Sequence, residues 1–308
     1  MEEKKRVGIL IVLYNSITHL DVLINSIQNQ IYENFKLYFY DCNSSEDEGS
    51  YLRNIYPQAD IFSSHGNIGF AKANNLLAQK AIKDGADYLF VLNPDMELSE
   101  NTLSALVTVM ESDRNIAACS SVLLFGAKEK NIIQLFGQSI NFKTQKKTFL
   151  YANQLLSSAK LPEYLQVDFV NGGSLFIRIE TIKQIGLFDE DYFMYNDEID
   201  LAYRITQIGK KVIVTSETKI WHNHDWSKEN IYGYKLMYYY MMRNRVLYFK
   251  KYGNYIYLLL DIISQILSLP LKIKMFIKIG SLGIIKYYYL GLWRGLIGEK
   301  GISDIKFK

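Results

Sequence analysis

Apolar runs and helix-spaced segments alternate over the first 112 residues of the chain. Val7–Leu13 is continuously apolar, as expected of a strand that is buried on both faces of a parallel sheet. His19–Gln30 follows, with leucine and isoleucine at helical spacing. This alternation predicts an α/β fold with an open, mostly parallel sheet flanked by helices. Further strands are expected at 35–40, 60–63 and 88–92, and further helices at 71–83 and up to about 112, the last beginning at Ser99, Asn101 or Thr102.

The pattern is less regular between residues 113 and 227. Phe125–Ala159 is polar, which leaves open either a loop over a site or an excursion of short strands. A Gly-Gly pair at 172–173 breaks one of the apolar runs. Strands are expected at 116–124, 169–177 and 211–215, and short helices at 181–185 and 197–208.

A long helix is expected at 230–252, and residues 253–271 after it contain a single charge, Asp261. That length suits a membrane span. However, a polar stripe at i, i+3, i+4 and i+7 runs along the segment, and this pattern favours an amphipathic helix that lies in the membrane interface. The stripe consists of Asp261, Ser264, Gln265 and Ser268.

Charge is distributed unevenly along the chain. Residues 228–308 carry 14 Lys and Arg against 4 Asp and Glu, while residues 1–227 carry 21 against 28, so the tail is near +10 and the body near −7. Half of the 24 tyrosines also lie in the tail. A basic, aromatic tail predicts contact with an anionic membrane surface, although a basic helical subdomain packed on the core would have the same composition.

Two cysteines, Cys42 and Cys119, give no disulfide framework and favour a reducing cytoplasm. Met1–Arg6 is charged and shows no signal-peptide pattern. We therefore expect a cytoplasmic protein that is peripheral on the inner face of the plasma membrane. We expect no nucleic-acid partner, and the sequence is compatible with a homodimer.

Polar side chains follow four of the predicted strands, at Asn15, Asp41, Asn67 and Asp95. In open α/β sheets ligands bind at the carboxyl ends of the strands. The four positions therefore predict one site at this edge of the sheet.

Asp95 is a candidate metal ligand, because its carboxylate follows an apolar strand and Mg²⁺ or Mn²⁺ prefers oxygen ligands and bridges phosphates. Asn93-Pro94-Asp95 by itself also fits an ordinary turn. His222 and His224 can ligate the same metal or touch a diphosphate, or be loop histidines. Their spacing is unlike that of a tetrahedral zinc site.

The strand-end residues also suggest contacts with a nucleotide. Asp41 can accept the imide N–H of uracil or thymine, or close an Asx turn with the serines after it. Asn67 and Gly69 form a turn that opens a helix, where backbone N–H groups and Lys72 can lie near phosphates.

An acidic cluster at 197–200 begins the predicted helix at 197–208. A general base must lie within hydrogen-bond reach of the proton that it takes, and we assign Glu198 to that role, with Asp197 as the alternative. Three solvated acids at a helix N-terminus would give the same spacing. Asp200 and Arg204 are four residues apart, so they can pair with each other or contact an acceptor.

Taken together, these motifs resemble the inverting glycosyltransferases of family 2, which have the GT-A fold, and are most similar to the bacterial rhamnosyltransferase-like branch that builds O-antigen and capsule polysaccharides. The resemblance covers about residues 6–250. The matching segments are Val12–Asn15, Asp41–Ser44, Asn67–Ala71, Asn93–Asp95, Gly172–Ser174, Gly186–Glu190, Phe193–Arg204 and Arg243-Asn244.

The resemblance implies a GT-A domain over 1–227, with a nucleotide-binding half at about 1–112 and an acceptor half at about 113–227, followed by a helical region at 228–308. It implies that Tyr14, Asn15 and Asp41 hold the base of the donor, with Asn93 beside them, and that Asp95 holds Mg²⁺ or Mn²⁺. Gly172 and Gly173 would lie at the acceptor. The catalytic base would belong to the pair Asp197-Glu198.

The sequence departs from the family at three positions. Asn93 stands where an aspartate is usual, the pair Asp197-Glu198 reverses the usual order, and Cys42 replaces an asparagine. The first two departures put the metal affinity and the identity of the base in doubt.

We expect inverting transfer of a sugar, L-rhamnose from dTDP-rhamnose by resemblance, to a lipid-linked or oligosaccharide acceptor in bacterial cell-surface polysaccharide synthesis. A galactosyl, glucosyl or N-acetylhexosaminyl transferase is the first alternative, and a catalytically weak nucleotide-sugar-binding protein is the second. A dinucleotide oxidoreductase is disfavoured, because no Gly-x-Gly-x-x-Gly follows the first strand.

Overall fold

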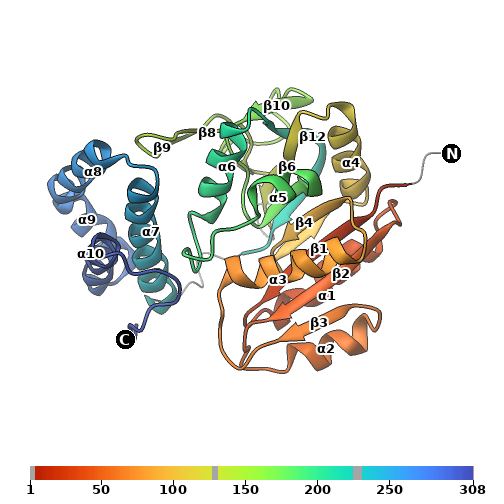
Figure 1. Ribbon diagram of the computed structural model, residues 1–308, viewed down its shortest axis with the longest axis horizontal. Coiled ribbons are helices and arrows are strands. Elements are labelled where there is room, and N and C mark those ends of the chain that lie inside the picture. The colour runs from red at the N-terminus through yellow and green to blue at the C-terminus, as the bar shows by residue number, and fades with distance from the viewer. Residues whose placement is uncertain (1–3, 127–130, 225–230, 308) are drawn as a thin grey trace.

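The computed structural model describes residues 4–126, 131–224 and 231–307. The boundary expected between residues 227 and 228 lies outside the described residues. Figure 1 shows a central sheet flanked by helices and, at the left, a separate layer of C-terminal helices.

The central sheet has the strand order β10-β12-β6-β11-β4-β1-β2-β3. Neighbours among β1, β2, β3 and β4 are parallel, with Val7 opposite Phe35, while β11 is antiparallel to both β4 and β6. The fold is therefore α/β with a mostly parallel sheet, as predicted. The strands are β1 (Val7–Leu13), β2 (Phe35–Asp41), β3 (Asp60–Ser63), β4 (Tyr88–Leu92), β5 (Met96–Leu98), β6 (Ile116–Phe125), β7 (Ile133–Leu135), β8 (Gln138–Asn141), β9 (Lys146–Phe149), β10 (Tyr164–Val167), β11 (Ser174–Arg178) and β12 (Lys211–His222).

Helices cover both faces of this sheet, because alternate residues of each strand point to opposite faces. Ile9 of β1 packs in the core under α1 (Ile17–Gln28), α2 (Glu48–Ile55) and α4 (Thr102–Ser112). Its neighbour Leu10 packs in the core under α3 (Phe70–Lys83), α5 (Ile179–Ile185) and α6 (Asp197–Gln207). The continuous apolar run of β1 is explained by this burial on both faces.

Two strand predictions are corrected by the structure. The strand expected from 169 begins only at Ser174, because Ser174 N donates to Asn171 O at 3.1 Å and closes a turn. β12 continues past 215 to His222, with a register shift between Thr215 and Lys219. The segment from 125 to 159 contains the hairpin β8–β9 and the short strand β7, so its described part is the excursion of short strands rather than a loop.

The C-terminal layer consists of α7 (Ile231–Lys251), α8 (Tyr255–Leu267), α9 (Leu269–Ile279) and α10 (Gly283–Leu296). The single helix expected over 253–271 is wrong, since the chain bends by 61° between α8 and α9. Within the described part of the chain, no single helix is long and apolar enough to cross a bilayer, although the bent pair together reaches that length and composition.

Candidate active site

Two adjoining cavities open at the carboxyl ends of β1 and β4. The first, of about 380 Å³, is lined by the loops after β1, β2 and β3. The second, of about 400 Å³, reaches from the end of β4 to the start of α6 and to α7. They share the wall residues Phe70, Asn93, Asp95, Met194 and His224.

The loops that line the first cavity are fixed by a buried carboxylate. Glu48 is fully buried in α2 and accepts hydrogen bonds from Ser16 N and, at 3.0 Å, from Ser44 Oγ. Burial raises the pKa of Glu48 above its usual value. Asn15, whose φ is +55°, accepts from Ser45 N at 2.8 Å. Asn15 thus holds the neighbouring loop, and half-exposed Tyr14 presents its ring to the cavity.

Asp41 closes the Asx turn that the sequence left open as an alternative. Its Oδ1 accepts from Ser44 N at 2.9 Å, and the neighbouring Cys42, rather than Asp41, is among the described residues that line the first cavity. Contact between Asp41 and a nucleotide base therefore stays a prediction.

The turn before α3 reaches the first cavity. Asn67 Oδ1 accepts from Gly69 N at 2.9 Å. Gly69 has φ +86°, and a Cβ there would lie 2.6 Å from Phe193 O, so only glycine fits. Lys72 is exposed on α3 and stands outside the described lining of both cavities.

Asp95 lies in the turn between β4 and β5, where the two cavities meet. His222, at the end of β12, places Nε2 3.1 Å from Asp95 Oδ2, and His224 places Nδ1 3.6 Å from the same oxygen. Burial opposes ionisation of Asp95, but the two histidines outweigh it and hold the pKa of this carboxyl below its usual value. Gln134 Oε1 lies 3.0 Å from His222 Nδ1 and fixes the ring.

These residues fit a divalent cation. Asp95 Oδ1 is buried and has no hydrogen-bond partner among the described residues, so it is an acceptor that a cation can satisfy. A cluster of three or more protein ligands does not occur in the part of the chain that the structure describes. A cation held here would therefore take most of its ligands from phosphate and water, as Mg²⁺ and Mn²⁺ do at nucleotide sites.

Asn93 and the Gly172-Gly173 pair form the floor between the cavities. Asn93 N donates to Gly173 O at 2.9 Å. A Cβ on Gly173 would lie 2.5 Å from Asn93 Cγ, so the glycine makes room for this side chain. At Gly172 a Cβ would lie 3.6 Å from Glu198 Cβ. The two glycines thus bring the end of β4 close to the acidic pair.

The acidic pair follows a strained turn. Tyr195 (φ +65°) and Asn196 (φ +67°) are both left-handed, a conformation that costs about 1–3 kcal/mol for a non-glycine residue. Asp197 is 3% exposed, and burial, followed by the charge of Glu198, raises its pKa well above the usual value.

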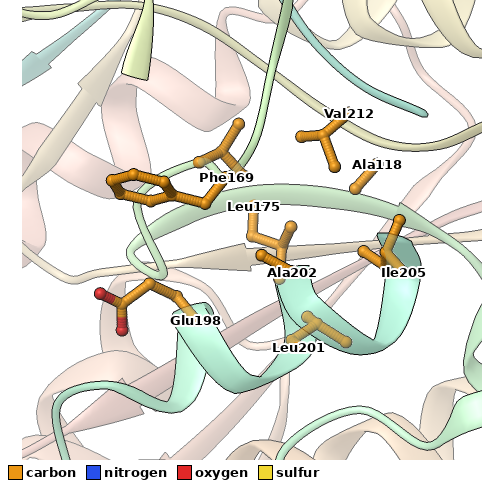
Figure 2. Close-up of a pocket in the computed structure, with 9 residues that line it drawn as sticks. Ala118, Phe169, Leu175, Glu198, Leu201, Ala202, Ile205 and Val212 are labelled. Atoms are coloured by element: carbon orange, nitrogen blue, oxygen red, sulfur yellow. The ribbon is translucent and has the colours of Figure 1, made fainter. Parts of the chain in front are cut away.

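Glu198 faces the second cavity. Its Oε1 lies 3.7 Å from Lys147 Nζ, on the β9 strand. Figure 2 shows the carboxylate pointing away from a cluster of apolar side chains that includes Phe169 and Leu201. The void among them is about 10 Å³, room for about one water, so the cluster supports the side chain and binds no ligand.

Asp200 and Arg204 do not reach the cavities, and the expectation that they contact an acceptor is corrected. Asp200 is fully buried and accepts hydrogen bonds from Arg204 Nε at 2.8 Å and Lys251 Nζ at 2.5 Å. Arg204 also donates to the carbonyls of Ile185 and Leu187. Both residues therefore connect α6 to its neighbours, because a buried carboxylate needs these partners.

Residues of α7 complete the second cavity, which the sequence did not predict. Gly233, Leu236 and Met237 form one wall. Asn244, fully buried, donates to the carbonyls of Met194 and Tyr195 at 2.7 and 2.8 Å. The match of Arg243-Asn244 to family members was the only signal for this contribution.

Residues 8–159 match the family model described as glycosyl transferase family 2. The protein carries a glycosyltransferase family 2 domain. The matched residues include the strand-end positions from Asn15 to Asp95, and the acidic pair follows after them in the chain.

Curated relatives of this glycosyltransferase are rhamnosyl- and hexosyltransferases. Rhamnosyltransferase WbbL of Escherichia coli (strain K12) is 26% identical over 202 residues, 60% of this chain and 75% of that protein. The low-salt glycan biosynthesis hexosyltransferase Agl10 of Haloferax volcanii is 27% identical over 168 residues, 53% of this chain and 50% of that protein. N-acetylglucosaminyl-diphospho-decaprenol L-rhamnosyltransferase of Mycobacterium tuberculosis is 21% identical over 234 residues, 70% of this chain and 75% of that protein.

Among solved structures, the glycosyltransferase is similar to GalNAc-T7 crystallised with UDP, GalNAc and Mn²⁺. The TM-score is 0.62 at 16% identity, over 81% of this chain and 48% of that chain. This likeness confirms the GT-A fold. The family implies a nucleotide-sugar donor and a saccharide acceptor, and the two adjoining cavities offer room for both.

Proposed function

We propose that this glycosyltransferase moves L-rhamnose from dTDP-rhamnose, with inversion, to a lipid-linked saccharide acceptor in bacterial cell-surface polysaccharide synthesis. The observation that carries the proposal is the pair of cavities that meet at Asp95, one lined by strand-end loops and the other by the acidic pair. Two of the relatives are rhamnosyltransferases, and one of them is named for an acceptor that carries a diphospho-lipid.

The first cavity would hold the donor. The exposed ring of Tyr14 offers a surface on which the base can stack, and the loop built around Asn15 and Ser16 would surround the ribose. Asp95 and His222 would hold Mn²⁺ or Mg²⁺ beside the diphosphate. When bound, such a cation supplies positive charge that stabilises the departing diphosphate.

The second cavity would hold the acceptor. Glu198 takes the proton from the attacking hydroxyl, whose oxygen forms a bond to the anomeric carbon while the bond from that carbon to the diphosphate oxygen breaks. Attack and departure occur on opposite faces of the sugar, which suits cavities on two sides of Asn93 and Asp95. Burial raises the pKa of Asp197 above its usual value, and we keep Asp197 as the alternative base.

Another hexose is the second candidate, because the hexosyltransferase Agl10 is about as similar to this chain as WbbL is. Which sugar the enzyme transfers depends on the side chains that contact the sugar of the bound donor.

We also propose a nucleotide-binding half at about 1–112 and an acceptor half from about 113. Helix α7 belongs with the acceptor half because it lines the second cavity.

The test is a donor panel with the full chain. Binding and hydrolysis of dTDP-rhamnose, UDP-galactose, UDP-glucose and UDP-N-acetylglucosamine are measured with Mn²⁺, with Mg²⁺ and with a chelator. We expect cation-dependent release of dTDP from dTDP-rhamnose. Release of UDP from a UDP-sugar instead would select the second candidate. Donor binding without release of the nucleotide for any acceptor would indicate a nucleotide-sugar-binding protein. No binding of any donor would reject the first cavity as a nucleotide site.

A further inference from the structure

Two residues of the polar stripe, Asp261 and Gln265, bond to neighbouring helices, while Ser264 is exposed. Arg245 Nη2 of α7 donates to Asp261 Oδ1 at 2.8 Å. Tyr288 OH of α10 donates to Gln265 Oε1 at 2.5 Å, and Lys272 Nζ donates to Gln265 O at 3.1 Å. These contacts join Asp261 and Gln265 to α7 and α10.

The opposite face of α8 and α9 is apolar and exposed. Ile256, Leu267 and Leu271 are 74%, 76% and 72% exposed. A helix at the surface of a soluble protein turns its apolar side to the core, and here the orientation is reversed, with only Leu258 of α8 and Phe276 of α9 fully buried. Also exposed on α8 and α9 are Leu259, Leu260, Ile263, Ile266, Ile273, Met275 and Ile277.

Positive charge borders the exposed apolar residues. Lys274 and Lys278 are exposed on α9, and no Asp or Glu occurs between Asp261 and Glu299. A contiguous apolar surface of this kind marks an interaction site. The absence of acidic residues and the interspersed lysines indicate that its partner is both apolar and negatively charged.

We propose that the exposed face of α8 and α9 docks on an anionic lipid bilayer, with the apolar side chains at the boundary between headgroups and acyl chains and Lys274 and Lys278 at the headgroups. A span is disfavoured because Asp261 is held in an ion pair with α7. A symmetric dimer of this chain is disfavoured as the partner. It would place the lysines of each copy against a segment that contains no acidic residue between Asp261 and Glu299.

Docking would place the bilayer against the same helical layer that lines the second cavity. α8 packs on α7, whose residues Leu236 and Met237 contact that cavity. A docked bilayer would present a lipid-linked acceptor to Glu198, and this part of the inference rests on the proposed function. The docking itself does not depend on which sugar is transferred.

The test is flotation of the full chain with vesicles of phosphatidylcholine alone or mixed with phosphatidylglycerol. One variant combines Ile256→Glu, Leu267→Glu and Leu271→Glu. The matched control combines Ile31→Glu, Leu150→Glu and Leu155→Glu, which are exposed elsewhere to similar degrees, 62%, 58% and 54%. We expect wild type and control to float with the anionic vesicles and the first variant to lose at least about tenfold in partitioning.

A second variant, Lys274→Gln with Lys278→Gln, tests the charge without disturbing the apolar packing. It should lower partitioning onto anionic vesicles about 25-fold, about fivefold for each lysine near the surface, and leave the melting temperature unchanged. Wild type that stays unbound, or equal loss in the matched control, overturns the proposal. A concentration-dependent dimer that the first variant dissociates, with no vesicle binding, would assign the face to a second copy.

Discussion

Asn244 of α7 donates a hydrogen bond of 2.8 Å to the carbonyl oxygen of Tyr195, whose backbone is left-handed with φ +65°. The two residues lie 49 positions apart, and the same amide donates to Met194 O. The C-terminal helical layer thus holds the strained turn that places Asp197 and Glu198 at the second cavity.

Asn244→Ala should therefore lower both stability and turnover. Removing the amide takes the donor away from two part-buried carbonyls, which costs about 0.5–1.5 kcal/mol per hydrogen bond in the free energy of unfolding. Chemical denaturation and kcat are measured together. Asn254→Ala is the control, because Asn254 begins α8 without a side-chain capping bond. Normal kcat in Asn244→Ala would mean that the turn keeps its shape without this contact.

Glu198→Gln should abolish turnover while donor binding stays close to wild type. Loss of a general base lowers kcat by about 100- to 10,000-fold, and the amide keeps the size of the side chain. Single-turnover kinetics and a donor titration separate the two effects. Turnover that survives in Glu198→Gln but not in Asp197→Asn would assign the base to Asp197.

Asp197→Asn should change the pH dependence of stability. Because the folded protein holds the Asp197 proton more tightly than the unfolded chain, the stabilising contribution is complete below the ordinary carboxyl pKa and is lost as pH rises through the raised folded-state pKa. Asparagine does not titrate, so the variant should melt at least about 2 °C above wild type at about pH 8 and at nearly the same temperature at about pH 4.

Asp304→Asn is the control for this measurement, since Asp304 is 80% exposed and its replacement should not alter the pH dependence. A melting-temperature difference between Asp197→Asn and wild type that is the same at every pH would show that Asp197 is ionised in the folded protein.

His222→Ala should weaken Mn²⁺ binding more than Mg²⁺ binding. The imidazole, 3.1 Å from Asp95, is a nitrogen ligand, and Mg²⁺ strongly prefers oxygen. Asp95→Asn should weaken the binding of both cations. Calorimetric titration of each cation in the presence of dTDP measures this, with His65→Ala as a control, because His65 is exposed and stands outside the described lining of both cavities. Equal effects of His222→Ala on the two cations would place the histidine outside the metal site.

Much of the fold and part of the site could be predicted from local pattern. The strands at 7–13, 60–63 and 88–92 have the predicted bounds. For 7–13 and 88–92 the reason is that an unbroken apolar run is a property of the segment itself. Asn15, Asn67 and Asp95 line one cavity. This agrees with the prediction that ligands bind at the carboxyl ends of the strands. Helix α2, with its buried Glu48, was not predicted, since the segment is short and mostly polar.

The sequence by itself determined the alternation of strands and helices in the first part of the chain, the candidate positions Asp95 and Glu198, and the positive charge of the tail. Only the tertiary structure decided that Asp95 meets His222 from 127 residues away, that Asp200 turns inward to Lys251, and that Asp261 and Gln265 of α8 bond to α7 and α10. Periodicity shows that a helix has two unlike faces. Which face is buried depends on the segments that pack against it, and those lie far away in the chain.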